Sequence, residues 1–171
     1  MKKESVLEYD NVRHTFEPIW NVDSKILILG TFPSVKSRKN NFYYGNPQNR
    51  FWKVVAKVLG CAEPMSIEEK KQMLIDSGIA IWDVIESCDI IGSSDNSIRN
   101  VSANDIERLV SLSEIRKIYA NGNKAAELYR KYVKTSAEIE LITLPSTSPA
   151  NASYSLDRLF TEWKKILNDL S

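Results

Sequence analysis

The sequence predicts an α/β fold, a three-layer α/β/α sandwich with a central four-stranded parallel sheet. Two observations predict it: four short apolar runs bounded by polar or turn residues, and amphipathic helical patterns between and after them. Parallel strands need crossover helices, and these cover both faces of the sheet. Because the chain has 171 residues and no linker rich in proline or glycine, we expect residues 1–171 to form a single domain.

The four apolar runs are expected to be buried strands. They cover residues 26–29, 79–82, 116–120 and 139–144. Polar residues or turn residues flank each run, as is typical of strands buried on both faces of a parallel sheet.

The first two helices follow from apolar spacing and from capping residues. Apolar side chains recur at positions i, i+3, i+4, i+7 and i+8 over residues 51–59, and Gly60 is placed to end that helix. Ser66 and Glu69 form a capping box before the second helix. Both helices are therefore expected to pack on the sheet or cross over it.

Three more helices are predicted further along the chain. Ser102 and Asp105 form a looser capping box before one, and Asn123 is placed to cap another. An amphipathic stripe over residues 156–170 predicts a terminal helix that packs in the core, whereas residues 89–100 are expected to form a polar loop. Three tryptophans lie among periodic apolar residues and are expected in the core: Trp52, Trp82 and Trp163.

Composition excludes several classes of protein. The 23 Lys and Arg nearly balance the 22 Asp and Glu, so any affinity for DNA has to come from a local positive patch. Two cysteines and one histidine are too few for a metal site built from Cys and His, so we expect no metal. No signal peptide and no apolar run of membrane-spanning length is apparent, so we expect a cytoplasmic protein with no membrane partner.

Polar and turn residues follow each predicted strand. Gly30 to Ser34 follow the first strand, Asp83 the second, Asn121 and Gly122 the third, and residues 145–151 the fourth. Ligands of open parallel sheets bind outside the carboxyl ends of the strands, so a site is expected at this edge. A single glycine or proline there would usually make only a turn.

The long connection over residues 31–48 strengthens the functional interpretation. It holds three consecutive aromatic residues, Phe42, Tyr43 and Tyr44, near several carboxamides. Aromatic faces beside carboxamides suit a flat heterocycle that is stacked on one face and hydrogen-bonded at its edges. The clustered carboxylates of metal nucleases and the GxGxxG, Walker and GxSxG motifs are absent from the sequence, which argues against the corresponding chemistries.

Two motifs resemble those of the uracil-DNA glycosylase superfamily, in particular its DNA-deoxyinosine (hypoxanthine-DNA) glycosylase branch. The first is Gly-Thr-Phe-Pro-Ser at residues 30–34, followed by Phe-Tyr-Tyr-Gly-Asn-Pro-Gln-Asn-Arg-Phe-Trp at residues 42–52. The second is Leu-Pro-Ser-Thr-Ser-Pro-Ala at residues 144–150. The resemblance spans about residues 13–167 and implies a cofactor-free enzyme that acts on DNA containing deaminated bases.

The resemblance also implies roles for the residues that contact the base. The loop of Gly30, Thr31 and Phe32 would contact the base, and Tyr44 would stack on it once it is flipped out of the helix. Asp83 stands where relatives have an amide or hydroxyl at the base edge; a carboxylate could accept the ring N–H of hypoxanthine or uracil, or it could cap a turn.

Two departures bear on the mechanism that the resemblance implies. Phe32 stands where many members of the superfamily have an Asn or Asp that positions water. In this branch the resemblance assigns that work to Asn49. The alternative for Asn49 is a cap on the following helix, which spacing alone would slightly favour. Asn46 replaces the usual histidine of the branch, so it can donate a hydrogen bond to a base carbonyl but cannot deliver a proton. The only histidine, His14, is expected to be a structural or entry-loop residue.

The DNA backbone is expected to contact a second group of residues. Hydroxyls and N–H groups would hold phosphates, and the loop after them is placed like the one that enters the minor groove in the superfamily. These residues are Ser34, Ser146, Thr147, Ser148, Pro149, Ala150 and Asn151. A local positive patch could come from Lys36, Arg38, Lys39 and Arg50, although a charged run is usually only a solvated face.

We therefore expect a monofunctional DNA glycosylase for hypoxanthine, uracil or xanthine, working as a monomer. A hydrolase of free nucleosides or nucleotides is one alternative, since it would need a sugar pocket but no minor-groove loop. A non-catalytic binder of DNA lesions is the other, and Asn46 makes it plausible. Release of base from duplex DNA separates the three.

Overall fold

The computed structural model describes residues 8–136 and 138–171. Along the chain the elements are β1 (Asp10–Arg13), β2 (Ile26–Gly30), α1 (Val35–Asn40), α2 (Phe51–Leu59), α3 (Ile67–Ser77), β3 (Ile79–Asp83), β4 (Ile85–Ile90), η1 (Asp95–Ser97), β5 (Arg99–Ala103), α4 (Ile106–Ser111), β6 (Lys117–Asn121), α5 (Asn123–Tyr132), β7 (Glu140–Leu144), α6 (Leu156–Trp163) and η2 (Lys164–Asp169).

The main sheet confirms the predicted four parallel strands. Its order is β3-β2-β6-β7, and every neighbouring pair is parallel. Each strand begins and ends within one residue of the range predicted from its apolar run. The carboxyl ends of all four strands therefore meet at one edge, as expected.

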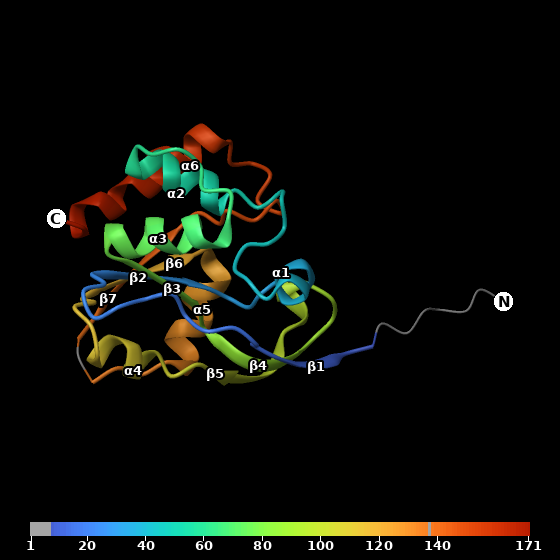
Figure 1. The fold of residues 1–171 in the computed structure, drawn as a ribbon. Coiled ribbons are helices and arrows are strands. Elements are labelled where there is room, and N and C mark those ends of the chain that lie inside the picture. Colours follow the sequence, from blue (N-terminus) through green and yellow to red (C-terminus); the bar gives the residue numbers. More distant parts are fainter. Residues whose placement is uncertain (1–7, 137) are drawn as a thin grey trace.

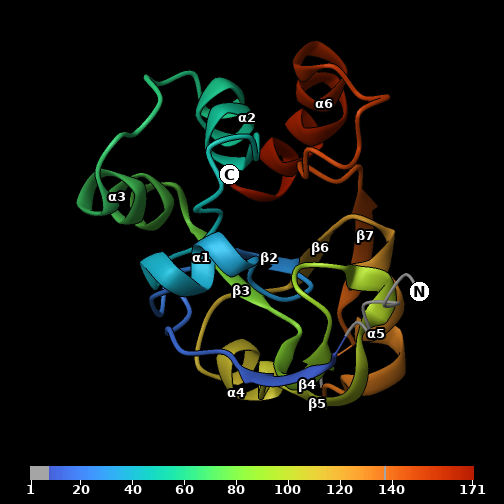
Figure 2. The same ribbon diagram turned by 90° about the vertical axis from the view of Figure 1, so that its right-hand side faces the viewer.

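Helices cover both faces of this sheet, which confirms the three-layer sandwich (Figures 1 and 2). All of β2 is buried, with Ile26 and Ile28 in the core beneath α2, α3 and α6. Leu27 and Leu29 belong to the second core, on the α4 and α5 side. Successive side chains of a strand point to opposite faces, so one apolar strand supplies both cores. Of the three tryptophans expected in the core, Trp52 and Trp163 are buried, whereas Trp82 is half-buried against both cores.

A second, antiparallel sheet corrects the loop prediction for residues 89–100. It has the order β1-β4-β5, and a single residue, Val84, separates β4 from β3. Within β4, Cys88 and Ile90 are buried while Ser87 and Asp89 are partly exposed. Because its outer side chains are polar and it is interrupted by turns, this part of the chain lacks the continuous apolar run that marked the other strands.

Helix ends agree with the capping predictions at some positions and differ at others. Ser66 caps α3 as predicted, and Gly60 ends α2 in the left-handed conformation. Asp105 itself, rather than Ser102, caps α4 because Ser102 belongs to β5. Gly122, rather than Asn123, precedes α5. The terminal helix ends at Trp163 and continues as the 3₁₀ helix η2, and none of the helices in the described part of the chain is long and apolar enough to cross a membrane.

Candidate active site

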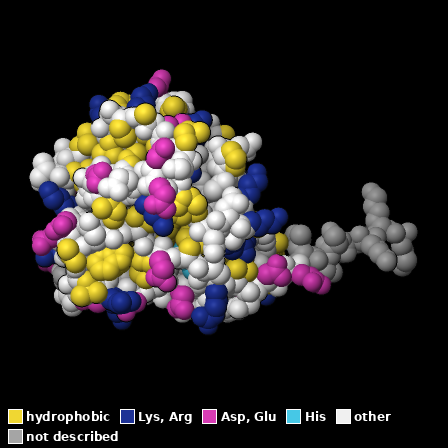
Figure 3. Space-filling model, viewed as in Figure 1, with side chains coloured by type: hydrophobic (Ala, Val, Ile, Leu, Met, Phe, Trp, Pro, Cys, Tyr) yellow, Lys and Arg dark blue, Asp and Glu magenta, His cyan; other side chains and the backbone are white. Residues whose placement is uncertain are grey.

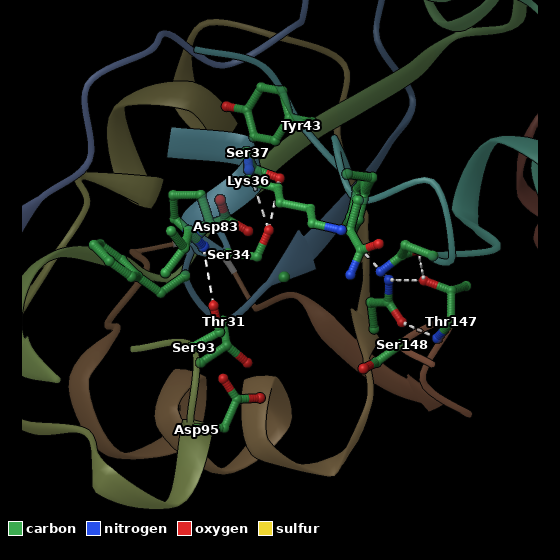
Figure 4. A pocket seen from close by; sticks show the side chains of 18 of the residues that line it. Thr31, Ser34, Lys36, Ser37, Tyr43, Asp83, Ser93, Asp95, Thr147 and Ser148 are labelled. Carbon is green, nitrogen blue, oxygen red and sulfur yellow. Dashed lines mark hydrogen bonds between the residues drawn. The ribbon is translucent and has the colours of Figure 1, made fainter. Parts of the chain in front are cut away.

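A pocket of about 540 Å³ opens at the carboxyl ends of the parallel strands (Figure 4). All of the predicted site residues except Asn151 line it. The lining also includes Pro33, Tyr43, Asn121, Lys36 and Lys39, which the sequence places at the strand ends, among the aromatic residues or in the positive patch. Five further lining residues carry no such expectation: Val35, Ser37, Ile90, Ser93 and Asp95. The pocket has the size of a small-molecule site, and its lining mixes aromatic faces with amides, hydroxyls and one buried carboxylate.

Three neutral side chains on one wall form a closed hydrogen-bond network, which we name the amide cluster: Asn49, Asn121 and Thr147. The Asn121 amide nitrogen donates to the Thr147 hydroxyl over 3.0 Å, and that hydroxyl donates to Asn49 Oδ1 over 2.8 Å. The Thr147 backbone N–H donates back to Asn121 Oδ1 over 3.0 Å. These hydrogen bonds connect the end of β6 with the loop after β7 and with the residue just before α2.

The Asn49 side chain accepts from the first N–H of α2, one residue before the N-cap Arg50, and faces the pocket at the same time. Its Oδ1 accepts from the Phe51 N–H over 3.0 Å, in addition to the bond from Thr147. A carbonyl oxygen has two lone pairs, so both acceptor positions of this amide are taken. The Nδ2 group is therefore the part of Asn49 that is left to contact a ligand or a water in the pocket.

Asp83 forms part of the opposite wall and is hydrogen-bonded to His14, which does not itself line the pocket; we name these two residues the carboxylate pair. His14 Nε2 lies 2.8 Å from Asp83 Oδ2, and the two side chains are 2% and 6% exposed. They meet because β1 pairs with β4, so that His14 follows β1 to the end of β3 and its N–H donates to the Glu86 carbonyl. The pairing of Ile19 with Ile81 then holds the following segment along the edge of β3.

Gly30 has to be a glycine because the Asp83 carboxylate lies against its backbone. A Cβ at position 30 would lie 2.3 Å from Asp83 Oδ1 and 3.1 Å from the Tyr44 hydroxyl. Asp83 is held at the backbone as well, since the Asn104 side-chain amide donates to its carbonyl over 2.9 Å. The position of the carboxylate therefore depends on the absence of a side chain at the end of β2.

Tyr44 combines a stacked face with a hydrogen-bonded hydroxyl. Its ring is stacked on Phe51 at 4.0 Å between centroids, and its hydroxyl accepts from the Asn121 amide over 3.3 Å. Burial, and secondarily the negative charge of Asp83, raises the pKa of Tyr44 and of its neighbour Tyr43. Both hydroxyls therefore keep their protons, and Tyr43 donates its proton to the Glu17 carbonyl over 2.9 Å.

The loop after β7 is shaped by its own hydrogen bonds and by Arg50. The guanidinium donates to the carbonyls of Ser148 and Asn151 over 3.2 and 3.1 Å, and also to the carbonyl of Tyr154. Asn151 donates its amide to the Ser146 carbonyl, so it closes the loop instead of lining the pocket. Pro149 and Ala150 are left exposed at the tip of the loop.

The hydroxyls of this loop differ in what they can still bind. Thr147 is fully buried and belongs to the amide cluster, so the geometry favours a positioning role over the phosphate contact expected from the sequence. The Ser146 and Ser148 hydroxyls accept backbone N–H groups, from Ser148 and Ala150 respectively. Each keeps its own O–H for donation.

Two members of the expected positive patch are turned inward. Arg50 holds the loop just described, and Arg38 donates to the Gly92 carbonyl while its guanidinium covers the Phe32 ring at 5.6 Å. Lys36 and Lys39 are exposed and line the pocket. On the face shown in Figure 3, Lys and Arg side chains gather near the position that α1 has in Figure 1.

Sequence reasoning missed three residues of this region for one reason. His14 was expected to be structural, and Ser93 and Asp95 belong to the stretch that was expected to be only a polar loop. All three reach the site through the second sheet, whose pairing joins segments far apart in the chain. Within residues 8–136 and 138–171 no group of three or more His, Cys, Asp or Glu side chains could hold a metal ion.

Comparison with known proteins gives consistent matches. The family model described as the uracil DNA glycosylase superfamily matches residues 18–171. A hypoxanthine DNA glycosylase of Methanosarcina acetivorans is 34% identical over 91% of this chain and 98% of its own length, and one of Methanosarcina barkeri is 27% identical over 66% and 72%. The solution NMR structure of a Methanosarcina acetivorans protein, provisionally assigned as a uracil DNA glycosylase, is similar with a TM-score of 0.75 and 34% identity, covering 91% of this chain and 96% of that one.

Proposed function

Because the chain belongs to the uracil DNA glycosylase superfamily, we infer that it is a DNA glycosylase that hydrolyses the N-glycosyl bond of deaminated bases in DNA. The observation that carries this inference is the pocket at the strand ends, where stacking, amide and carboxylate groups converge on a space of about 540 Å³. Such a pocket suits a single base that has been flipped out of the helix.

The reaction needs one water and no redox partner. The bond between C1′ of the deoxyribose and the base nitrogen breaks, and its electron pair leaves with the base. The water oxygen bonds to C1′, and its proton balances the one that the departing base takes up. The products are the free base and an abasic site with a hydroxyl at C1′. Because the sugar passes through an oxocarbenium-like state, positioning of the water matters more than a strong base.

We propose that Asn49 holds this water through Nδ2. Its Oδ1 already has two donors, Phe51 N–H and the Thr147 hydroxyl, which fix the orientation of the amide. An N–H that donates to a water oxygen leaves a second lone pair of that oxygen free to attack. The rigid amide cluster thus supports a preorganised water.

We propose further roles for the residues around the base. Tyr44, already stacked on Phe51, would extend the stack over the flipped base. Asp83 Oδ1 would accept the ring N–H that hypoxanthine, uracil and xanthine share. Gly30, Thr31 and Phe32 would form the floor beside it, and Asn46 Nδ2 would donate to a base carbonyl, since its Oδ1 accepts from the Gln48 N–H.

The DNA backbone would be held at two places around the pocket. Ser146 and Ser148 would donate to phosphate oxygens, and Ser34 would do so once its hydroxyl leaves Ser37 Oγ, to which it now donates over 3.1 Å. The exposed Pro149 and Ala150 would enter the minor groove. Lys36 and Lys39 would supply positive charge near the pocket rim. The monomeric state, the single domain and the cytoplasmic location stay predictions from the sequence.

The experiment that tests this function is single-turnover release of base, without added metal, from duplexes carrying one deoxyinosine or one deoxyuridine. We expect release by the wild-type protein. For Asn49→Ala we expect the rate to fall by about 100-fold or more, the size of a lost positioning contribution.

A second variant separates the water from the helix cap. Asn49→Ser keeps a side-chain oxygen for the Phe51 N–H but cannot place an N–H at the position of Nδ2. We expect its rate to stay close to that of Asn49→Ala. Asn168, which is exposed on η2 and does not line the pocket, supplies the control: Asn168→Ala should retain the wild-type rate. Recovery of activity in Asn49→Ser would assign Asn49 to capping alone, and tight binding without release by wild type would favour the lesion binder.

A further inference from the structure

His14 and Asp83 form a pair that neither the motifs nor the proposed reaction explains. Both side chains are almost completely buried, and the bond between His14 Nε2 and Asp83 Oδ2 is 2.8 Å long. A buried carboxylate without compensation is strongly unfavourable, so such a pair needs a reason. The pair also lies at the pocket, because Asp83 is one of its lining residues.

The histidine is enclosed by aromatic rings that hold it in one place. Its ring lies 4.5 Å from Phe16, 5.9 Å from Tyr43 and 6.3 Å from Phe32, measured between centroids. An ionised carboxylate has no proton to give, so Nε2–H donates and Oδ2 accepts. Among the residues that the structure describes, no other side chain or backbone group bonds to the Asp83 carboxylate. Its second oxygen, Oδ1, lies beside Gly30 and is therefore the one available to a ligand.

The protonation state of Asp83 decides which bases can fit this oxygen. Hypoxanthine carries a proton on N1 and uracil on N3, whereas the parent bases adenine and cytosine carry a lone pair there. A carboxylate accepts from an N–H and repels a lone pair. A protonated carboxylic acid can donate to a lone pair instead.

We propose that His14 is a specificity-determining positioning residue. By donating to Oδ2, it holds the Asp83 carboxylate with Oδ1 as the acceptor that binds the deaminated base and rejects its parent. This inference rests on the proposed glycosylase function and adds the group that sets its selectivity. Without His14, Oδ2 loses its hydrogen-bond donor, and the buried carboxylate is no longer fixed as an acceptor toward the base.

The test compares single-turnover release from duplexes carrying deoxyinosine or deoxynebularine, whose purine has an N1 lone pair and no added bulk. The measured quantity is the ratio of the two rates for each protein. Any difference in the intrinsic lability of the two bonds cancels when this ratio is compared between proteins. A purely structural role of His14 would lower both rates and leave the ratio unchanged.

Two histidine variants keep or remove the donor. His14→Gln can place an amide N–H near the position of Nε2, so we expect its ratio to stay within about threefold of wild type. His14→Leu removes the donor, and we expect the ratio to fall by about tenfold or more, as for the loss of a hydrogen bond to a charged group. Thermal melting of each variant checks that it is folded.

Asp83→Asn keeps the test decisive if His14→Leu does not fold, because it removes the charge and retains the shape. We expect its ratio to fall as well, and the double variant His14→Leu/Asp83→Asn to fall no further than Asp83→Asn. An unchanged ratio in Asp83→Asn, or an unchanged ratio in a folded His14→Leu, would overturn the inference. Wild-type protein that releases neither base would contradict the proposed function itself, and this inference with it.

Discussion

The two walls of the pocket are built on different principles. The amide cluster is neutral, and each of its three side chains makes more than one hydrogen bond within the chain. The carboxylate pair is joined by a single short hydrogen bond between side chains 69 positions apart in the sequence. The amide cluster fixes the positions of its side chains through several directional hydrogen bonds. The carboxylate pair instead orients a single carboxylate.

This difference assigns different tasks to the two walls. A network of neutral groups suits the placement of a water and of the DNA backbone, because its geometry does not depend on ionisation. A buried carboxylate with one free oxygen suits discrimination, because it accepts from one kind of base edge and repels another. Damage to the first wall should therefore slow release of every base, and damage to the second should change the choice of base.

The largest effect in this comparison is expected for Gly30→Ala, which forces the carboxylate out of place. The new Cβ would lie 2.3 Å from Asp83 Oδ1, so the carboxylate has to move by roughly an ångström, and such a displacement costs about 100-fold in rate. Single-turnover release from a deoxyinosine duplex measures it. Gly60→Ala, where a Cβ meets no atom within 4 Å, is the matched control and should retain the rate although its left-handed backbone costs stability.

A smaller effect is expected for Thr147→Val, which removes the centre of the amide cluster at almost constant volume. The change leaves the Asn49 oxygen and the Asn121 amide each without one partner, a loss of about 1–3 kcal/mol in the free energy of unfolding for a buried polar group. We expect release to slow about tenfold or more for deoxyinosine and deoxyuridine alike, as measured on the two duplexes. Thr161→Val, on an exposed face of α6, should change neither; a change in base preference would contradict the separation of tasks.

The smallest effect is expected for Arg50→Met, which frees the loop that carries the backbone contacts. Ordering that loop on DNA should then cost about 1 kcal/mol, which weakens duplex binding about fivefold in a fluorescence titration while the rate at saturation changes less. Arg50→Lys should not restore the affinity, since an ammonium lacks the fork that reaches several carbonyls. If lysine restored the affinity, Arg50 would act through its charge on the DNA phosphates. Arg130→Met, at an exposed position, serves as the control.

What the sequence predicts well follows from local regularity. The strand ends collect Gly30, Asp83 and Asn121 because parallel strands share one edge, and an apolar run marks each strand. Asn49 was identified through its motif, and both of its alternative roles have support in the structure, since the cap uses the oxygen and the pocket faces the rest of the amide. These features depend on neighbours in the chain or on a regular fold.

What the sequence did not predict depends on pairing between distant segments. His14 reaches Asp83 only when β1 pairs with β4, and neither strand has the apolar run that a buried strand shows. Arg50 was expected in the positive patch, but its guanidinium donates to backbone carbonyls. The presence of a charged residue in the sequence does not reveal whether its side chain is solvated or bonded within the fold. A lone histidine and an arginine before a helix carry no local signal of the partners that tertiary structure brings to them.

The N-terminal strand β1 has a consequence for how this enzyme could diversify. His14, the residue directly after β1, contacts the carboxylate that we propose selects the base, and it precedes Gly30 and all the glycosylase motifs; β1 is held to the rest of the molecule along one edge of β4. Under this proposal, substitutions in this peripheral segment alter which lesions are removed while the machinery for breaking the bond stays intact. Preference and catalysis would then evolve as separate modules of a single small protein.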